Sequence, residues 1–319
     1  MVVTASKVLV TGAGGFIGRA LCADLARRGV AHVAAVRGGG DESDPARRAL
    51  GDFAAADWEH ALDGVDTIVH LAGRAHVTGR DHDPTPHIVA NVHVTRRLLD
   101  AARRARVRRV VFASTVKVYG ETTRPGRPFR AGDAAQPRDA YARSKAEAEN
   151  LVWQACRDGD MEGVVLRWPL VYGEGVKGNF ALLIEAVAGE RRLPFAGVDN
   201  RRSLLYVGNA VTAIAAALEV PALAGQTLPV ADARPVSTPE LILKIAAALG
   251  VEARLSRMPT SVLRAGAALM GRRGASSRLL GSLEIDASRF AELARWTPSV
   301  GVDEGIAATI AWWRARHVL

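Results

Sequence analysis

Tyr141 and Lys145, a tyrosine and a lysine four residues apart, are the two side chains in this sequence that are best suited to chemistry. On a helix, residues at this spacing project from one face. An ammonium beside a phenol stabilises the phenolate, so we expect Lys145 to lower the pKa of Tyr141. Such a phenol can exchange a proton with a substrate hydroxyl while a nicotinamide exchanges a hydride. The alternative is a routine Tyr–Lys pair on a helix surface.

Two hydroxyl side chains, Ser114 and Thr115, stand at the end of an apolar run that predicts a strand over Arg109–Ser114. Ligands of parallel sheets bind at the carboxyl ends of the strands, so a hydroxyl at this place points into the crevice. There it can hydrogen-bond the reacting oxygen and hold it near Tyr141.

Three glycines at three-residue spacing follow a predicted strand at Lys7–Thr11 and precede a predicted helix over Phe16–Arg28. Glycines permit a tight turn and a close approach of the backbone to a pyrophosphate, and the helix N-terminus supplies free N–H groups and a favourable dipole. The context of strand and helix favours a dinucleotide site over an ordinary glycine-rich turn. The expected cofactor contacts at this turn are Gly12, Gly15, Phe16, Ile17 and Gly18.

Arg37 follows the second predicted strand, His32–Val36, at a place where NAD-binding chains usually carry an acid. Arginine pairs with a 2′-phosphate, so NADP(H) is favoured over NAD, although a solvated arginine is an alternative in so basic a chain. Asp52 and Phe53 could hold the edge and the face of the adenine, and Asp52 could equally cap a helix.

Strands and helices alternate in the first half of the chain, which predicts an α/β fold with a doubly wound, Rossmann-type parallel sheet. Residues 1–167 are expected to form the nucleotide-binding domain, and residues 168–319 a smaller mixed substrate-binding domain with segments that could return to the sheet. Beyond the elements named above, the pattern predicts strands at Thr67–Ala72 and Gly163–Arg167, and helices at Ile88–Arg106, Ala140–Arg157, Phe180–Gly189, Asn209–Glu219, Thr238–Leu249 and Ser261–Met270.

Composition excludes several classes of partner. The net charge is +9, but the basic residues are scattered, so nucleic-acid binding is not expected, whereas a doubly anionic nucleotide would be attracted. The two cysteines, Cys22 and Cys156, are far apart, and no metal site is expected from the Cys, His and Asp spacing. With no long apolar run and no secretory leader, we expect a cytoplasmic protein that does not contact a membrane.

Taken together, the motifs resemble those of the extended short-chain dehydrogenases, and within them the NAD-dependent epimerase/dehydratase group of the UDP-glucose 4-epimerase-like branch. The matching segments cover almost the whole chain: TGAGGFIG at 11–18, HLAG at 70–73, NVHVT at 91–95, STVKVYG at 114–120, YARSK at 141–145, RWPLVYGEGVKGNF at 167–180, DASR at 286–289 and WTP at 296–298.

The resemblance implies a role for each matching residue. Tyr141 corresponds to the acid/base tyrosine of the family, Lys145 to its partner and Thr115 to the catalytic Ser/Thr. Further cofactor contacts are implied at Leu71, Ala72, Gly73 and Asn91, and at Tyr141 and Lys145 themselves. A UDP-sugar substrate is implied, with Asn179, Arg202 and Arg278 as contacts of its nucleotide diphosphate; a helix cap or a solvated arginine is the alternative at the first two. The family is commonly homodimeric through the helices expected at Ile88–Arg106 and Ala140–Arg157.

Departures from the family pattern bear on the reaction. Leu170 replaces an Asn that contacts the hexose, and Leu279 and Leu283 replace an acid and a tyrosine, so the pocket suits a 6-deoxy or N-acetylated hexose. These positions and Arg37 favour reduction of a 4-keto UDP-sugar, with 4-epimerisation of a UDP-hexose kept open. A dehydratase is disfavoured because Val116 and Lys117 stand where it needs an acid. A non-catalytic dinucleotide sensor is the alternative of another class.

Overall fold

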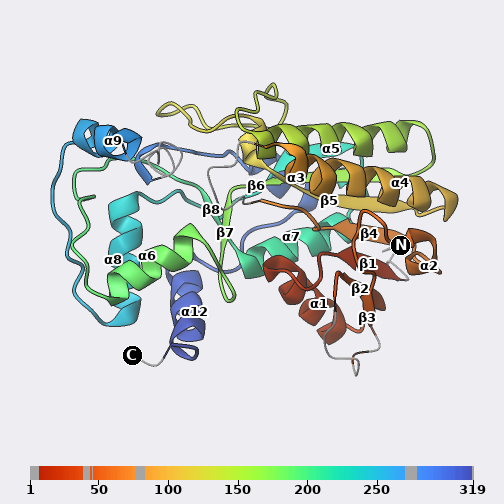
Figure 1. Cartoon of the computed structure of the whole chain (residues 1–319), viewed down its shortest axis with the longest axis horizontal. Coiled ribbons are helices and arrows are strands. Elements are labelled where there is room, and N and C mark those ends of the chain that lie inside the picture. Colours follow the sequence, from red (N-terminus) through yellow and green to blue (C-terminus); the bar gives the residue numbers. More distant parts are fainter. Residues whose placement is uncertain (1–6, 39–43, 45, 76–82, 270–278, 318–319) are drawn as a thin grey trace.

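The computed structural model describes residues 7–38, 44, 46–75, 83–269 and 279–317. Within them, seven parallel strands form one sheet in the order β3-β2-β1-β4-β5-β6-β9 (Figure 1). The order reverses between β1 and β4, the switch point at which such sheets bind their ligands. The strands are β1 (Val8–Thr11), β2 (His32–Val36), β3 (Arg47–Ala49), β4 (Thr67–His70), β5 (Arg109–Thr115), β6 (Glu162–Trp168) and β9 (Gln226–Pro229). The predicted doubly wound fold is confirmed.

Helices cover both faces of the sheet, because successive strand residues point to opposite sides and both sides are apolar. Leu9 and Ile68 pack toward one group of helices, and Val8 and Val69 pack toward the other. The first face carries α2 (Trp58–Ala61), α4 (Val94–Arg104) and α5 (Ala140–Arg157), and the second carries α1 (Phe16–Arg27), α7 (Val207–Glu219) and α11 (Ser288–Ala294). Three short helices lie in the connections between these elements: α3 (Thr85–His87), η2 (Val116–Val118) and η3 (Pro221–Leu223).

A π-helical turn, η1 (Ile88–His93), precedes α4. We predicted one uninterrupted α-helix over Ile88–Arg106, and this expectation is wrong in its first two turns. The wider turn matters because Asn91 lies within it, and π turns often occur at functional sites.

A second lobe has its own apolar core, which includes Tyr172, Phe180 and Trp313. It consists of a two-stranded sheet and helices that lie at the far end of the molecule from β1–β3 (Figure 1). Its elements are β7 (Leu170–Tyr172), α6 (Asn179–Ala188), β8 (Leu204–Tyr206), α8 (Thr238–Leu249), α9 (Thr260–Leu269) and α12 (Val302–Arg314). Since β9 and α7 belong to the first lobe, the chain after residue 168 contributes to both.

The first turn of α1 connects the two lobes. Phe16 and Ile17 pack against the core of the second lobe. The backbone of Gly175, in the loop after β7, comes so close that an added Cβ would lie 3.2 Å from the Phe16 ring. The second lobe therefore rests directly on the helix that follows the glycine turn.

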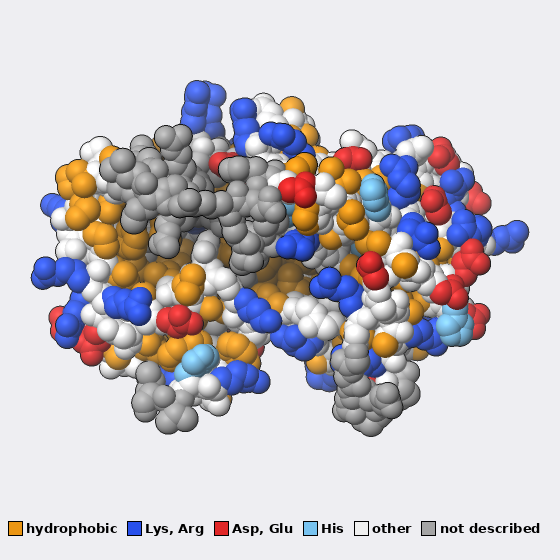
Figure 2. All heavy atoms as spheres, viewed as in Figure 1, with side chains coloured by type: hydrophobic (Ala, Val, Ile, Leu, Met, Phe, Trp, Pro, Cys, Tyr) orange, Lys and Arg blue, Asp and Glu red, His pale blue; other side chains and the backbone are white. Residues whose placement is uncertain are grey.

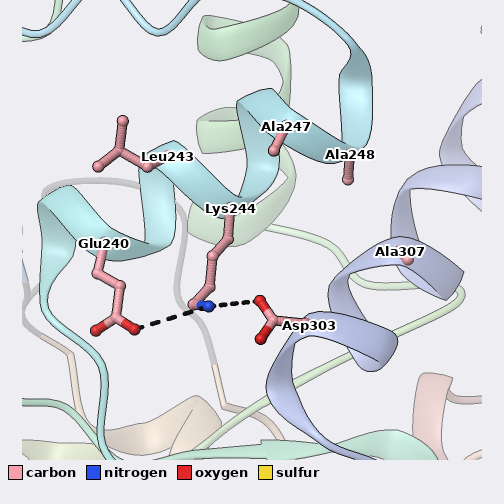
Figure 3. Close-up of a pocket in the computed structure, with 7 residues that line it drawn as sticks. All are labelled: Glu240, Leu243, Lys244, Ala247, Ala248, Asp303 and Ala307. Carbon is pink, nitrogen blue, oxygen red and sulfur yellow. Dashed lines mark hydrogen bonds and ion pairs between the residues drawn. The ribbon is translucent and has the colours of Figure 1, made fainter.

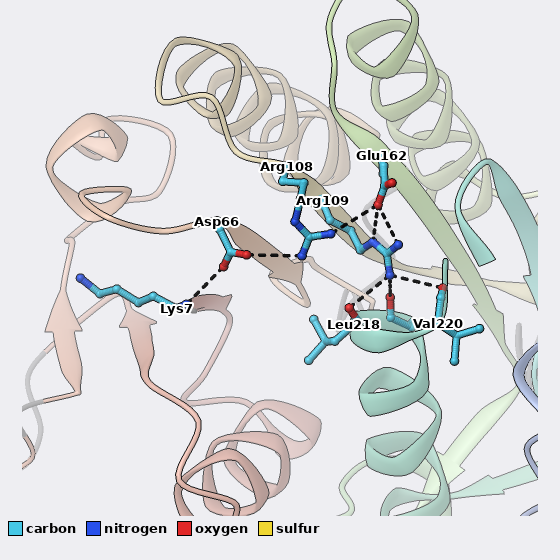
Figure 4. Close-up of polar contacts among 8 residues, drawn as sticks. Lys7, Asp66, Arg108, Arg109, Glu162, Leu218 and Val220 are labelled. Atoms are coloured by element: carbon cyan, nitrogen blue, oxygen red, sulfur yellow. Dashed lines mark hydrogen bonds and ion pairs between the residues drawn. The ribbon is translucent and has the colours of Figure 1, made fainter. Parts of the chain in front are cut away.

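Arg109 lies at the start of β5, at the end of the sheet opposite to the glycine turn. Its side chain is 2% exposed, and Nη1 donates to the carbonyl oxygens of Ala217, Leu218 and Val220 at distances of 3.0, 3.1 and 3.3 Å (Figure 4). Nε donates to Glu162 at 2.7 Å. The guanidinium satisfies carbonyls that the end of α7 leaves without partners within the helix, and its charge suits the negative end of the helix dipole.

We expect Arg109→Met to lower the free energy of unfolding by about 3 kcal/mol, because it leaves buried carbonyl groups without donors. Neighbouring Arg108 pairs with Asp66 and Glu162 at 3.3 and 3.5 Å but is a third exposed, so Arg108→Met should cost less than about 1 kcal/mol. Urea denaturation of both variants measures the difference. Equal losses of unfolding free energy in the two variants would show that the buried hydrogen bonds to α7 stabilise the fold no more than the partly exposed ion pairs of Arg108.

Candidate functional site

The glycine turn between β1 and α1 is sterically restricted to glycine at two positions. Gly12 has a φ of +71°, and a Cβ there would lie 2.8 Å from the Ala72 backbone nitrogen. A Cβ on Gly18 would lie 2.2 Å from the carbonyl oxygen of Gly12. Gly15 is the N-cap of α1, and no side chain caps the helix. The N–H groups of the first turn are therefore available to a ligand, as expected for a pyrophosphate site.

Phe16 and Ile17 can contribute only backbone groups to the site, because their side chains pack toward the second lobe. Arg19, one turn further, folds back and donates from Nη1 to the carbonyl oxygen of Gly14 at 2.6 Å. The glycine turn thus carries a cation on its surface in addition to the helix dipole.

At the end of β2, the structure brings together the residues predicted to hold the adenosine. Arg37 is exposed, and a hydrogen bond from Leu50 to Val36 at 2.9 Å brings the segment that carries Asp52 close to it. Asp52 accepts a hydrogen bond from the Ala54 N–H at 3.0 Å, so it stabilises a turn and does not cap a helix. The ring of Phe53 is buried, with its centroid 5.2 Å from that of Trp58.

The two residues singled out first, Tyr141 and Lys145, lie one turn apart on α5. Asp139 is the N-cap of this helix and accepts a hydrogen bond from the Ala142 N–H at 2.7 Å. Lys145 is 4% exposed, and its Nζ lies 3.9 Å from the ring centroid of Phe112 on β5. The helix therefore holds the ammonium against the sheet and leaves Tyr141 half-buried.

The expected lowering of the phenol pKa is not found in the chain on its own. Burial raises the pKa of Tyr141 to about 12, and a hydrogen bond with Thr115 only partly offsets it. Burial also lowers the pKa of Lys145 to about 7, against the opposing charge of Glu149. Since the lysine is then only partly protonated near neutral pH, its ammonium acts weakly on the phenol.

Thr115 ends β5, and its hydroxyl is buried beside the phenol. Its Oγ1 also accepts the Lys117 N–H at 3.3 Å, which makes Thr115 the N-cap of η2. Ser114 points elsewhere, because it donates to Glu149, which is paired with Arg167 at 2.6 Å. Thr115, Tyr141 and Lys145 are thus brought together, and Ser114 serves a buried ion pair.

A buried histidine, His70, connects the glycine turn to the helix layer. It is 1% exposed, its Nδ1 lies 2.7 Å from Thr11 Oγ1, and its Nε2 lies 2.8 Å from Thr95 Oγ1. Thr95 donates its own proton to the Asn91 carbonyl at 2.6 Å, so it must accept from Nε2–H. Nδ1 then accepts from Thr11, whose oxygen also accepts the Ala72 N–H at 3.1 Å.

Asn91 continues this chain of hydrogen bonds to α5. Its Oδ1 accepts the Arg74 N–H at 2.8 Å, and its Nδ2 donates to Ser144 Oγ at 2.9 Å. Ser144 in turn donates to the Tyr141 carbonyl at 2.8 Å. A Cβ on Gly73 would lie 2.9 Å from Asn91 Oδ1, so the segment after β4 that carries Leu71, Ala72 and Gly73 passes directly over the amide.

Two of the predicted substrate contacts lie in the second lobe. Asn179 is exposed as the first residue of α6, and Gly178 is the N-cap, so the asparagine does not act as a cap. Arg202 pairs through its backbone with Leu283, which packs against Val116 beside Thr115, and its Nη1 donates to Gly281 at 2.8 Å. Arg278 lies outside the described residues.

Sequence reasoning missed His70 and Ser144 as parts of the site. A usable signal exists for His70, because it pairs in register with Thr11 at the ends of adjacent parallel strands, which brings two polar side chains to one place. Ser144 lies within the Tyr141–Lys145 segment, but only the position of Asn91 reveals its role.

Other features of the described chain do not enter this site. No group of His, Cys, Asp and Glu in the described residues could hold a metal ion, and no described helix is long and apolar enough to cross a membrane. A groove of about 450 Å³ lies between α8 and α12, where Lys244 contacts Glu240 at 3.8 Å and pairs with Asp303 (Figure 3). None of the predicted site residues lines it.

Comparison with known proteins agrees with this geometry. The profile of the NAD dependent epimerase/dehydratase family matches residues 8–230. UDP-glucose 4-epimerase of Vibrio cholerae is 34% identical over 308 residues, 95% of this chain and 94% of that protein. The 2-alkyl-3-oxoalkanoate reductase of Stenotrophomonas maltophilia (strain K279a) is 32% identical over 267 residues, 76% of each chain. UDP-glucuronic acid 4-epimerase from Bacillus cereus, solved with NAD, has the same fold with a TM-score of 0.81, at 22% identity over 98% of this chain and 97% of that one.

The buried ring of His70 gives a testable dependence of stability on pH. Burial, assisted by the charge of Lys145, lowers the pKa of His70 to about 3. Between about pH 6.5 and 3 the unfolded chain binds a proton that the folded chain does not, so the free energy of unfolding falls as the pH falls. At pH 4.5 the loss from this residue is about 2–3 kcal/mol.

The measurement is urea denaturation at pH 7 and pH 4.5. His70→Gln should show a smaller loss between the two pH values than the natural chain, because the titrating ring is gone. His60→Gln, at an exposed position, should keep the full loss. If His70→Gln also keeps it, the ring is protonated in the folded state and the assigned proton positions are wrong.

Proposed function

The chain belongs to the NAD dependent epimerase/dehydratase family, and from this premise we propose that it is an enzyme that transfers a hydride at C4 of a UDP-linked hexose. One observation carries the proposal: Thr115 and Tyr141 share a hydrogen bond, and Tyr141 and Lys145 lie on a helix that is tied to the glycine turn through Asn91 and His70. The long match to UDP-glucose 4-epimerase of Vibrio cholerae supports C4 of a UDP-hexose as the reacting centre.

The glycine turn fits a nicotinamide dinucleotide. The backbone passes Ala72 at a distance that no side chain on Gly12 would allow, and the first turn of α1 has no side-chain cap. A bound dinucleotide would supply the acceptor or donor of the hydride. Gly12, Gly15 and Gly18, with the N–H groups of Phe16 and Ile17, would hold its pyrophosphate.

In this proposal Tyr141 moves the proton of the substrate hydroxyl. Tyr141 would accept that proton as the phenolate during oxidation, and as the phenol it would return the proton during reduction. Thr115 shares a hydrogen bond with the phenol and is placed to hold the reacting oxygen next to it. Lys145 contributes a positive charge to the same site, and positive charge there lowers the pKa of the phenol.

The nucleotide diphosphate of the substrate would bind toward the second lobe. Asn179 is exposed at the start of α6. Arg202 pairs through its backbone with Leu283, and Leu283 packs against Val116. Lys and Arg side chains gather around the hollow between the lobes (Figure 2), in a chain with a net charge of +9. Such a field favours a doubly anionic group.

Epimerisation is the mode that the Vibrio cholerae relative supports best. Reduction of a 4-keto sugar remains a second candidate because of two features of this chain. Arg37 is exposed where NADP(H) would present its 2′-phosphate, and Leu170 is 42% exposed at the start of β7, where an apolar side chain suits a 6-deoxy or N-acetylated hexose.

Tyr141→Phe distinguishes an enzyme from a dinucleotide sensor. We expect the substitution to reduce turnover of a UDP-hexose about 1,000-fold, because the proton can no longer be transferred, while binding of NAD(H) stays within a factor of about two. Steady-state kinetics and fluorescence titration of the nucleotide measure the two effects. Undiminished turnover in the variant would remove Tyr141 from the mechanism, and with it the reaction proposed here.

The identity of the nucleotide separates the two modes of reaction. Mass spectrometry of nucleotide released from the purified chain should find NAD for an epimerase, whereas an empty site that binds NADPH indicates a reductase. If Arg37 holds a 2′-phosphate, Arg37→Ala should weaken NADPH binding at least about tenfold and leave NADH binding unchanged. Equal effects on both nucleotides would contradict the NADP(H) preference. Incubation with UDP-N-acetylhexosamines, their 4-keto derivatives and UDP-galactose then identifies the sugar.

A further inference from the structure

A second lysine, Lys117, stands beside the catalytic group. It lies in η2, two residues after Thr115, and its side chain is 24% exposed. Its Nζ pairs with Asp139 and lies 3.8 Å from Glu121. The chemistry described above gives this ammonium no role.

The contacts of Lys117 join the two elements that carry the catalytic residues. Its backbone N–H donates to Thr115 Oγ1 at 3.3 Å, on the side of β5. Its ammonium pairs with Asp139, the N-cap of α5 and the second residue before Tyr141. One residue therefore contacts both the threonine and the cap of the tyrosine helix.

The charges that face Tyr141 come from several elements. Asp139 and Lys145 belong to its own helix. Lys117 comes from η2, and Glu121, which lies near Lys117, comes from the residues after η2. The His87 ring lies 5.9 Å from the phenol ring. The Lys117 Nζ is 5.9 Å from the centroid of the Tyr141 ring. The Asp139 carboxylate raises the pKa of Tyr141, and an ammonium paired with that carboxylate acts in the opposite sense.

We propose that Lys117 is a positioning residue of the active site, which ties the Thr115 turn to the cap of α5 and balances the Asp139 carboxylate beside the Tyr141 hydroxyl. The proposal rests on the proposed function for the part that Tyr141 plays in proton transfer. It explains why a lysine is suited to this place, since a neutral side chain would leave a carboxylate charge near a phenol that must ionise.

The test is a set of four variants: Lys117→Met, Asp139→Asn, the double variant and Lys117→Arg. Asparagine is as good an N-cap as aspartate, so Asp139→Asn removes the charge and keeps the cap. The full chain, with the nucleotide that it retains, is labelled at the Cζ carbon of its four tyrosines and titrated by NMR. Tyr141→Phe assigns the Tyr141 signal.

Lys117→Met should move the titration midpoint of Tyr141 upward, and Asp139→Asn should move it downward by about one pH unit. The double variant should return toward the natural midpoint, and Lys117→Arg should stay near it. Shifts of the single variants in the same direction, or no shift in Lys117→Met, would overturn the proposal. A merely structural role would lower the thermal midpoint of unfolding in all variants without this opposition of sign.

The NMR titration requires no turnover, so it separates this proposal from the proposed function. If Tyr141→Phe leaves turnover intact, the proposed function fails, while the opposite shifts still decide the role of Lys117. Where turnover is measurable, the limb of the pH profile of kcat on which activity rises as the phenol ionises should move with the NMR midpoint in each variant. A profile that stays fixed while the midpoint moves would contradict the link between Lys117 and proton transfer.

Discussion

The hydrogen bonds of the His70 ring join the end of β1 to the π turn that carries Asn91. Burial lowers the pKa of the ring and keeps it neutral, and the proton is then on Nε2, because Thr95 gives its own proton to the Asn91 carbonyl and can only accept from the ring. Asn91 passes the connection to Ser144 and so to the Tyr141 carbonyl. The glycine turn and α5, which lie far apart in the sequence, are held in one arrangement by this chain of contacts.

Burying so many polar groups is stable only because each has a partner. An unpaired donor or acceptor in an apolar interior costs about 1–3 kcal/mol, so a partly satisfied chain would be less stable than an apolar one. The π turn supplies a geometry that an α-helix lacks, since it places Asn91 where its amide reaches both Arg74 and Ser144. The close passage of Gly73 over that amide follows from the same arrangement.

Local sequence was sufficient for elements with a strong periodic pattern. The predicted bounds of His32–Val36 and Ala140–Arg157 are confirmed. The need for glycine at the turn after β1 follows from the close approach of the backbone there. The π turn was missed because apolar periodicity does not reveal an extra residue in a helical turn, and the contact of Asn91 with Ser144, 53 residues further along the chain, is visible only in the fold. The raised pKa of Tyr141 was also missed, because spacing shows that Lys145 is near and does not show how deeply both groups are buried.

Burial makes the charge of Lys145 dependent on what else enters the crevice. Glu149 lies one turn further along α5 and opposes the lowering of the lysine pKa, but its carboxylate is already bound by Arg167 and Ser114. The Arg167 guanidinium offsets the negative charge of this carboxylate, so the net attraction for a second cation is smaller. Burial therefore lowers the pKa of Lys145 in the folded chain, and an anionic group bound beside the ammonium would raise that pKa again. Under the proposed function, a phosphate-bearing ligand bound near Lys145 would favour the protonated lysine, and the protonated lysine would in turn favour the ligand.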